Sequence, residues 1–396
     1  MLQQNVFQFP ISGVSIMDTT KSILFEPTKI KNMDLRNRFI RSATYDACAD
    51  KGSVTEKQIN LYTTLAEGGV GVIITGITSV HNNGQISKFQ NSISSDEFIS
   101  GFKRLTSAVH DWGAKIAVQL FHAGREGRFP KSSGRVPIGP SFLEMDPYFK
   151  AEYRAMMENE IWEVIRAFGD GAKRAREAGF DAVQIHGAHA YLLSQFLSPY
   201  TNRRRDEWGG ELKNRLRLHH EILKDIRQKV GEDYPVLIKI GVQDVFPGGL
   251  EFSEGKLAAK YLAELGFDAL EISQGLRGPN DEDTEFRTKI NTLDREAYFR
   301  NWCHQIKNQV EVPVMMVGGL RTFKLMEEII QNKEADFISL SRPLVREPGI
   351  INEWKRGDRH RTKCISCNEC FESLIKGKTL ECVQVKKQKC LEANDV

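Results

Sequence analysis

Hydrophobic residues form two kinds of segment that alternate along the chain. The first kind is short, rich in Val, Ile, Leu or Phe, and shows little polar alternation, which is typical of parallel strands buried on both faces. Eight such strands are predicted: Phe39–Ala43, Val70–Ile77, Lys115–Phe121, Ala182–Ala188, Pro235–Gly241, Ala269–Gly275, Val312–Gly319 and Phe337–Pro343. The second kind is longer, repeats its apolar residues about every 3.6 positions, and predicts amphipathic helices. Seven such helices are predicted: Glu56–Glu67, Asp96–Trp112, Asn159–Ala178, Glu211–Val230, Ser253–Leu265, Arg295–Gln309 and Phe323–Asn332.

This alternation predicts an α/β fold, a closed (β/α)8 TIM barrel with a short cysteine-rich C-terminal extension. A doubly wound sheet usually has fewer strands and a glycine-rich turn after its first strand, and no G-x-G-x-x-G follows Phe39–Ala43. We predict the barrel over residues 22–362, an N-terminal extension over 1–21 and the tail over 363–396. The long segment His122–Glu158, between the third and fourth strands, is predicted to lie over the C-terminal mouth of the barrel.

Composition narrows the class of protein. The 396 residues are 40% hydrophobic and 27% charged, with a net charge of +3, so a large core can form and a nucleic-acid surface is not expected. No apolar run is long enough to span a membrane, and residues 1–21 lack the pattern of a secretory signal. We expect a cytoplasmic protein without a membrane or nucleic-acid partner, and a homo-oligomer of undetermined size.

Five of the seven cysteines crowd the tail. Cys364, Cys367, Cys370 and Cys382 have the Cys-x2-Cys-x2-Cys spacing, with a remote fourth cysteine, of ligands to a [4Fe-4S] cluster. In a reducing cytosol such crowding indicates metal binding more than disulfides. Two alternatives remain: zinc held by four thiolates, and a vestigial motif without metal. Cys390 is expected to be unliganded.

The end of the fourth predicted strand concentrates polar side chains, namely His186, His189 and Tyr191. Functional residues of such barrels lie at the carboxyl ends of strands. A single histidine there is more often a structural hydrogen-bonding residue, whereas two imidazole N–H donors can converge on one substrate oxygen as it gains negative charge. A tyrosine hydroxyl keeps its proton at neutral pH and can donate it. We predict that these three residues are catalytic.

The last two predicted strands end in Gly318-Gly319 and Ser341-Arg342. Barrels commonly bind phosphate after strands seven and eight, where glycines allow close backbone approach and an arginine can bind in bidentate fashion. The placement predicts a phosphate site.

Four motifs resemble those of the old yellow enzyme family, in the expected order: Asn37–Thr44, Val118–Gly124, His186–Pro199 and Thr201–Gly210. The similarity runs from about Leu24 to Pro348, and the His186 motif with the following Thr-Asn-Arg-Arg stretch is highly specific. The resemblance implies noncovalent FMN over the barrel mouth.

The resemblance assigns flavin contacts to ten residues: Ser42, Ala43, Thr44, Gly76, Gln119, Lys239, Gly318, Gly319, Ser341 and Arg342. The first three would pass their backbone along the isoalloxazine ring, the next two would reach its pyrimidine side, and the last four would hold the phosphate. Lys239 stands where the family usually has an arginine, so it keeps a positive charge near the flavin N1–C2 region but lacks the planar fork. Tyr45 stands where other members have threonine or cysteine. Members with covalent flavin attach it through a cysteine at this point, and Tyr45 cannot form that bond.

The implied reaction is ping-pong. NAD(P)H reduces FMN, and an α,β-unsaturated carbonyl compound then binds with its oxygen on His186 and His189. Hydride passes from flavin N5 to the β-carbon, and Tyr191 protonates the α-carbon. The expected function is therefore that of an NAD(P)H-dependent ene-reductase.

Two other functions stay open. The tail resembles the cluster motif of the 2,4-dienoyl-CoA reductase and trimethylamine dehydrogenase branch, so an amine dehydrogenase that passes electrons to a protein partner is one alternative. An electron-transfer flavoprotein without its own small substrate is the other. The His-x-x-His-x-Tyr pattern favours the ene-reductase, because an oxyanion site suits enones whereas a cationic amine calls for an aromatic cage.

Overall fold

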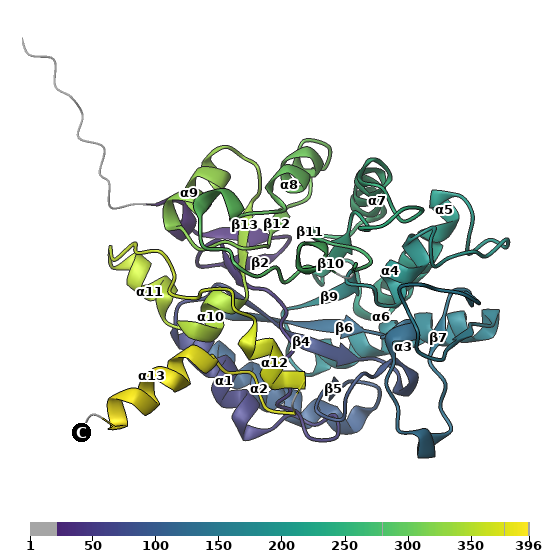
Figure 1. Ribbon diagram of the computed structural model, residues 1–396, viewed down its shortest axis with the longest axis horizontal. Helices are drawn as coiled ribbons and strands as arrows, with labels where there is room; N and C mark the ends of the chain where they lie inside the picture. Colours follow the sequence, from purple (N-terminus) through teal and green to yellow (C-terminus); the bar gives the residue numbers. More distant parts are fainter. Residues whose placement is uncertain (1–21, 279, 376, 395–396) are drawn as a thin grey trace, which may run out of the picture.

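Eight parallel strands close into a barrel in the computed structural model, which describes residues 22–278, 280–375 and 377–394 (Figure 1). The strands follow the order β3-β13-β12-β11-β10-β9-β6-β4, and β3 also pairs with β4, which closes the ring. Their bounds are β3 Phe39–Arg41, β4 Val72–Ser79, β6 Lys115–Phe121, β9 Ala182–Gly187, β10 Val236–Gly241, β11 Ala269–Ser273, β12 Val314–Met316 and β13 Phe337–Leu340. The predicted TIM barrel is confirmed, and the extension predicted over 1–21 lies outside the described residues.

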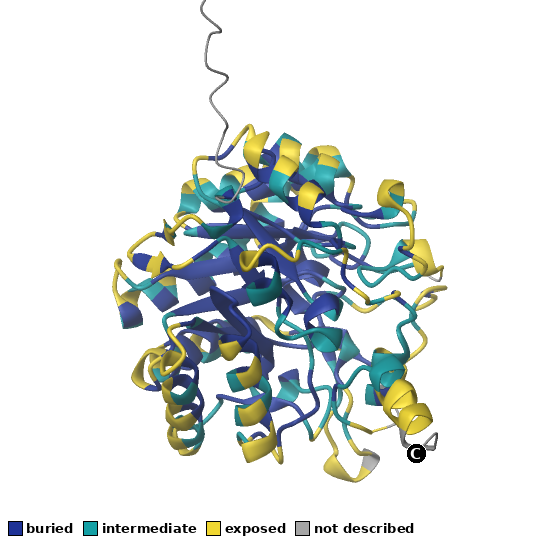
Figure 2. Cartoon of the chain, turned by 90° about the vertical axis from the view of Figure 1, so that its left-hand side faces the viewer, coloured by how far each residue is buried: buried dark blue, intermediate teal, exposed yellow. Residues whose placement is uncertain are grey.

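Helices cover the outside of the barrel, with buried residues toward the strands and exposed residues toward solvent (Figure 2). The helices between strands are α1 Glu56–Glu67, α2 Ile99–His110, α3 Glu158–Glu177, α4 Leu192–Leu197, α5 Leu212–Arg215, α6 Arg217–Val230, α7 Phe252–Leu265, α8 Arg300–Lys307 and α9 Phe323–Gln331. All seven predicted helices are present, although several of their ends differ; Asp96–Phe98, for example, form a 3-10 turn before α2. The helix predicted over 211–230 is divided at Leu216, and α8 begins at Arg300 rather than Arg295 because Ala297 has a left-handed φ of 51°.

The N-terminal end of the barrel is closed by an unpredicted hairpin, β1 Thr28–Ile30 and β2 Met33–Leu35. Ile30, Met33 and Leu35 form one buried cluster with inward-facing strand residues such as Leu237 and Phe337. The barrel is therefore sealed by apolar side chains at this end, and its open end is the opposite one, where the strands finish.

Side chains inside the barrel change character from one layer to the next. Successive inward-facing residues are two positions apart along a strand. On β10 and β11 the inward-facing residues Leu237 and Ala269 belong to the apolar cluster that closes the N-terminal end of the barrel. The next inward-facing residues, Lys239 and Glu271, are charged and buried. The polar layer lies directly beneath the open end and forms the floor of the functional site.

After the last strand, α10 Arg342–Arg346 and α11 Ile350–Lys355 complete the barrel's helices. The cysteine-rich tail then forms α12 Glu369–Ile375 and α13 Val383–Asn394, drawn yellow in Figure 1, which sequence patterns did not predict. The tail folds back on the barrel, where the Leu380 N–H donates to the Asp46 carbonyl oxygen at 2.9 Å.

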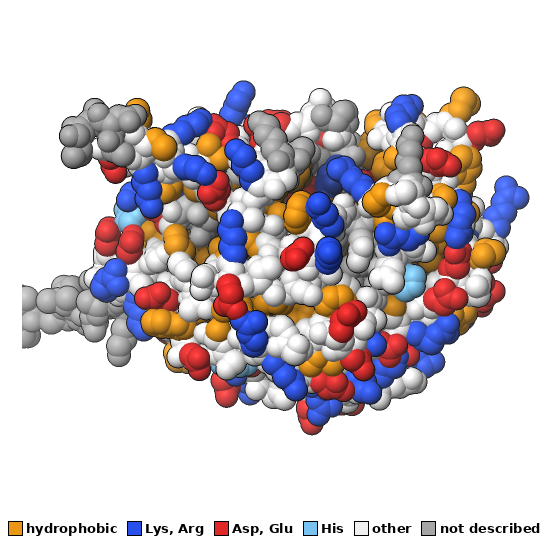
Figure 3. All heavy atoms as spheres, turned by 90° about the horizontal axis from the view of Figure 1, so that it is seen from below, with side chains coloured by type: hydrophobic (Ala, Val, Ile, Leu, Met, Phe, Trp, Pro, Cys, Tyr) orange, Lys and Arg blue, Asp and Glu red, His pale blue; other side chains and the backbone are white. Residues whose placement is uncertain are grey.

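Three surface features complete the fold. The segment predicted to cover the mouth contributes Glu126 and Arg128 to the cavity wall, and farther along it pairs β7 Ile138–Gly139 with β8 Arg154–Ala155. Acidic and basic side chains are interspersed on the face drawn in Figure 3. Over the described ranges, no helix combines the length and apolar character needed to cross a membrane.

Candidate functional site

A cavity of about 500 Å³ opens at the carboxyl ends of the barrel strands. It is lined by the three predicted catalytic residues and by nine of the ten predicted flavin contacts. The exception is Gly76, which lies behind the wall, where its N–H donates to the Tyr62 hydroxyl oxygen at 2.8 Å. A Cβ at Gly76 would lie 2.9 Å from the Thr44 carbonyl oxygen, so the glycine lets β4 pass close to the cavity-lining segment.

His186 ends β9 and offers one free ring nitrogen to the cavity side. The Ala188 N–H donates to its Nδ1 at 3.4 Å, so a neutral ring carries its proton on Nε2. Burial is the largest cause that lowers the pKa of His186 well below its usual value, and the nearby His189 and Lys239 lower it further. The imidazole therefore stays neutral at physiological pH and can act as a hydrogen-bond donor.

His189 lies 5.0 Å from His186 between ring centroids, with the two rings perpendicular. Its Nε2 is 2.7 Å from the Ser273 hydroxyl and its Nδ1 is 3.6 Å from a Glu285 carboxylate oxygen. His189 has a left-handed φ of 60°, and such backbone strain is typical of functional positions. Burial, then Lys239, lowers the pKa of His189 well below its usual value. Both histidines are therefore neutral, and the Nε2 of His189 already has a hydrogen-bond partner in Ser273.

Tyr191 stands beside the two histidines, at the start of α4 Leu192–Leu197. Its ring packs edge-on against Phe121 at 4.5 Å and lies 5.1 Å from the His186 ring. The Arg277 guanidinium is 5.4 Å above the Tyr191 ring.

Arg277 and Glu285 were missed by sequence reasoning. They form an ion pair in which two nitrogens of Arg277 contact the same carboxylate oxygen: Nε lies 3.0 Å and Nη2 2.8 Å from Glu285 Oε1. Arg277 follows closely after the sixth barrel strand, so its position near a strand end was the available signal.

The cavity floor is a hydrogen-bonded layer across the barrel. Gln119 Nε2 donates to Gln184 Oε1 at 2.7 Å, and Gln184 Nε2 donates to Glu271 Oε2 at 2.9 Å. Lys239 Nζ lies 3.3 Å from Glu271 Oε2 and donates to the Ser42 hydroxyl at 3.0 Å. The predicted cation Lys239 is therefore in the floor, but it is paired with an anion that was not predicted.

Part of the cavity wall is a glycine cradle. Gly318 and Gly319 have φ values of +118° and +72°, and a Cβ on either would come within 3.0 Å of the Tyr298 ring. Ser341 and Arg342, which follow the neighbouring strand β13, line the same cavity. Arg321, which sequence reasoning missed, also lines it, and its Nε is buried without a protein partner, as is the Ser339 hydroxyl. These polar groups fit a phosphorylated ligand.

The tail cysteines gather beside this cradle. Cys364, Cys367, Cys370 and Cys382 all line one small cavity, whereas Cys390 is exposed on α13. Among these sulfur atoms, all in the described part of the chain, no three lie within 4.8 Å of one another. A single zinc ion with four Zn–S bonds of about 2.3 Å would draw its ligands closer together.

The segment 364–370, called the cysteine loop below, is connected to the main cavity by hydrogen bonds from two arginines. Arg321 donates to the Cys364 carbonyl oxygen and to the Ser366 hydroxyl, and Arg342 donates to the Asn368 side chain. Cys370 and Asn368 line both cavities. The predicted metal site and the predicted flavin site therefore share a wall.

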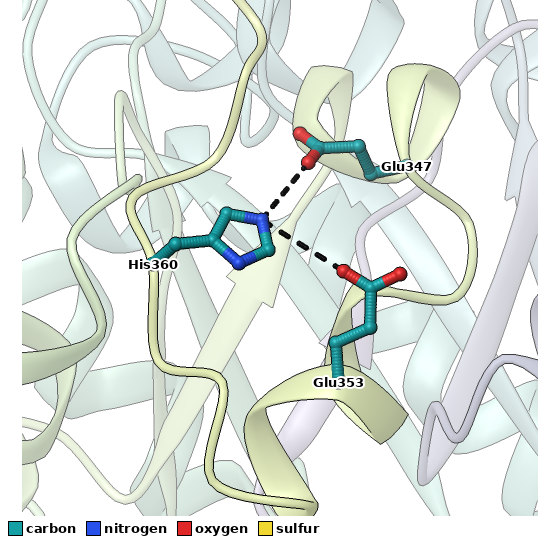
Figure 4. Close-up of side chains that lie close together, drawn as sticks. All are labelled: Glu347, Glu353 and His360. Atoms are coloured by element: carbon teal, nitrogen blue, oxygen red, sulfur yellow. Dashed lines mark hydrogen bonds and ion pairs between the residues drawn. The ribbon is translucent and has the colours of Figure 1, made fainter.

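His360 anchors the segment that leads into the cysteine loop (Figure 4). Its Nδ1 is 3.0 Å from Asp358, and its Nε2 is 3.3 Å from Glu347 and 3.7 Å from Glu353. The hydrogen bond with Asp358 is the largest cause that raises the pKa of His360, so these carboxylates favour the charged imidazolium.

Comparison with known proteins supplies a family. The model described as the NADH:flavin oxidoreductase / NADH oxidase family matches residues 23–360. An NADH oxidase of Thermoanaerobacter brockii is 36% identical over 352 residues, which are 87% of this chain and 52% of that protein. An NADPH dehydrogenase of Clostridium acetobutylicum is 36% identical over 330 residues, 83% of this chain and 93% of that protein. The chain thus spans about half the length of the first relative and most of the second.

Solved structures of the same architecture are also similar. A 2-naphthoyl-CoA reductase in complex with 2-naphthoyl-CoA superposes with a TM-score of 0.83 at 26% identity, covering 91% of this chain and 56% of that one. A histamine dehydrogenase from Rhizobium sp. 4-9 gives a TM-score of 0.80 at 27% identity, covering 91% of this chain and 52% of that one.

Proposed function

Because the chain belongs to the NADH:flavin oxidoreductase / NADH oxidase family, we propose that it is an FMN-dependent ene-reductase. The proposed substrate is a small α,β-unsaturated carbonyl compound, and the proposed reductant is NAD(P)H. The observation that carries the proposal is the group of His186, His189 and Tyr191 in one cavity with the polar floor that contains Lys239. Neutral imidazoles and a phenol suit a substrate that gains negative charge on oxygen and a proton on carbon.

The residues present fit FMN. The cavity of about 500 Å³ lies within the usual range for cofactor pockets. Lys239 would lie beneath the flavin ring, and the glycine cradle with Arg342 and Arg321 would hold the phosphate. Bound FMN would supply the hydride for reduction of the substrate double bond.

The chain's own residues would bind and polarise the substrate. His186 Nε2–H would donate to the carbonyl oxygen, and His189 would join it after giving up its contact with Ser273 or Glu285. Both rings would stay neutral donors, since burial is the main cause of their lowered pKa values. Their hydrogen bonds would strengthen as charge develops on the oxygen, which lowers the barrier. Tyr191 would hold the proton destined for the α-carbon.

A second candidate function is an amine dehydrogenase or electron-transfer flavoprotein that uses a [4Fe-4S] cluster and a protein partner. Four cysteines around one small cavity, next to the proposed flavin cavity, favour a cluster that exchanges electrons with the flavin. The similarity to histamine dehydrogenase is in line with this reading. Against an amine substrate, two imidazole donors and Arg277 would surround it with groups that repel or fail to bind a cation.

Tyr191→Phe tests the proposal. We expect enone turnover to fall about 10²- to 10⁴-fold, the usual contribution of a positioned proton donor. Reduction of bound flavin by NAD(P)H should stay within about twofold of wild type. Tyr261→Phe, which removes the same hydroxyl from the outer helix α7, is the matched control and should change neither rate. Unchanged enone turnover in Tyr191→Phe would reject the assigned role.

A further inference from the structure

Glu271 is a fully buried carboxylate in the barrel floor for which the proposed reaction has no use. It comes from β11 and faces three partners. Its Oε1 accepts from the Ser42 hydroxyl at 2.7 Å, and its Oε2 accepts from Gln184 at 2.9 Å and lies 3.3 Å from Lys239 Nζ. Glu271 and Lys239 therefore form a buried ion pair.

Lys239 has little freedom to move. Its side chain is 3% exposed, and its ammonium is held between Glu271 and the Ser42 hydroxyl. Ser42 itself donates its proton to Glu271, so all three side chains are fixed in one arrangement. Glu271 therefore fixes the position of the Lys239 ammonium and offsets part of the positive potential that this ammonium produces in the cavity.

We propose that Glu271 is a positioning residue that sets the reduction potential of the bound flavin by fixing Lys239 and offsetting its charge. The inference rests on the proposed function in one respect, namely that FMN binds above Lys239. Two-electron reduction adds negative charge to the flavin ring, and a lone cation beneath the ring stabilises that charge. Glu271 opposes this effect because it places an anion in the same water-poor layer, where charges are weakly screened.

The direction of the effect follows from the charges. With the carboxylate present, the floor is close to neutral, so the flavin keeps a low potential and reduced flavin remains a strong hydride donor. Without it, the floor is cationic, so the reduced flavin is bound more tightly than the oxidised flavin and gives up its hydride less readily. A merely structural role for Glu271 would alter stability without shifting the potential in this direction.

Glu271→Gln is the direct test, because it removes the charge and keeps the size. We expect the binding of reduced FMN relative to oxidised FMN to strengthen at least tenfold, which raises the two-electron potential by about 30 mV or more. The potential is measured by dye-coupled reduction of the FMN-loaded protein. Glu334→Gln, which removes a carboxylate paired with Arg300 after α9, is the matched control and should leave the potential unchanged.

Glu271→Met is a second variant that tests the same layer if Glu271→Gln fails to fold. It also removes the carboxylate that lies beside Lys239 and should likewise raise the potential. Wild-type protein that binds no FMN would overturn the proposed function itself. Wild-type protein that binds FMN, with a potential in the Glu271 variant equal to or below that of wild type, would overturn only this inference.

Discussion

The glycine cradle permits a quantitative prediction through Gly319→Ala. Gly319 has a φ of +72°, and an added Cβ would lie 2.9 Å from two atoms of the Tyr298 ring. The ring cannot easily give way, because its hydroxyl donates to the Glu285 carbonyl oxygen at 2.7 Å and Arg287 stacks 4.6 Å above it. The backbone of the cradle must therefore shift instead.

The magnitude is the sum of two effects. A left-handed alanine costs about 1–2 kcal/mol, and overpacking against a fixed ring about 1–3 kcal/mol. The strain is relieved when the backbone that holds the phosphate moves away, and FMN binding must then restore the strained position. A cost of about 2–4 kcal/mol on binding lowers FMN affinity about 30- to 700-fold. Affinity is measured by quenching of FMN fluorescence, with a thermal melt of the FMN-free protein to report loss of stability.

Gly266→Ala is the matched control. Gly266 caps α7 in the left-handed conformation with a φ of +105°, and nothing lies within 4 Å of an added Cβ. It carries left-handed backbone strain without the clash, so stability should fall by about 1–2 kcal/mol while FMN affinity stays unchanged. Wild-type FMN affinity in Gly319→Ala would refute the assignment of the cradle to the phosphate.

Two further predictions concern the tail and the core. Cys367→Ser should abolish iron and acid-labile sulfide in anaerobically purified protein, whereas Cys390→Ser should leave both unchanged; equal iron in the two variants would exclude the four-cysteine site. His219 is fully buried with both ring nitrogens unpartnered, and burial lowers its pKa to about 3. Because the unfolded chain takes up this proton below about pH 6.5 and the native chain does not, the wild-type free energy of unfolding should fall by about 2 kcal/mol between pH 7 and pH 5 from this residue alone. His219→Leu should lose that share of the acid sensitivity in urea titrations, and an unchanged pH dependence would contradict the reasoning.

The barrel could be predicted from the sequence because parallel strands buried on both faces have a distinctive composition. The strand at Val314–Met316 is apolar throughout, and the period-two rule then places alternate residues inside. The hairpin Thr28–Leu35 was missed because its strands have three residues each, too few for a pattern to show. The tail helices were missed for a related reason, since α13 has no apolar face that a helical period could reveal.

Functional residues at the carboxyl ends of strands could be predicted from the sequence, whereas their contacts with residues distant in the sequence could not. His186, His189 and Lys239 could be placed from their strands alone. The partners that decide their behaviour could not: Glu271 is the one charged residue of its strand, but its pairing with Lys239 is a contact between strands, and the Glu285 contact to His189 comes from a loop. Arg321 joins the cradle to the cysteine loop through contacts 43 and 45 residues apart in sequence, which no local pattern encodes.

The central claim is that this cavity binds FMN and delivers hydride to an enone whose oxygen His186 and His189 hold. The most direct measurement is anaerobic rapid mixing of the NAD(P)H-reduced protein with 2-cyclohexen-1-one, following the flavin absorbance and the saturated ketone formed. The account predicts flavin reoxidation with one ketone formed per flavin, and a rate that falls about 10²- to 10³-fold in His186→Ala. A flavin that stays reduced in the presence of this and other enones, yet is reoxidised by a one-electron protein acceptor, would contradict it.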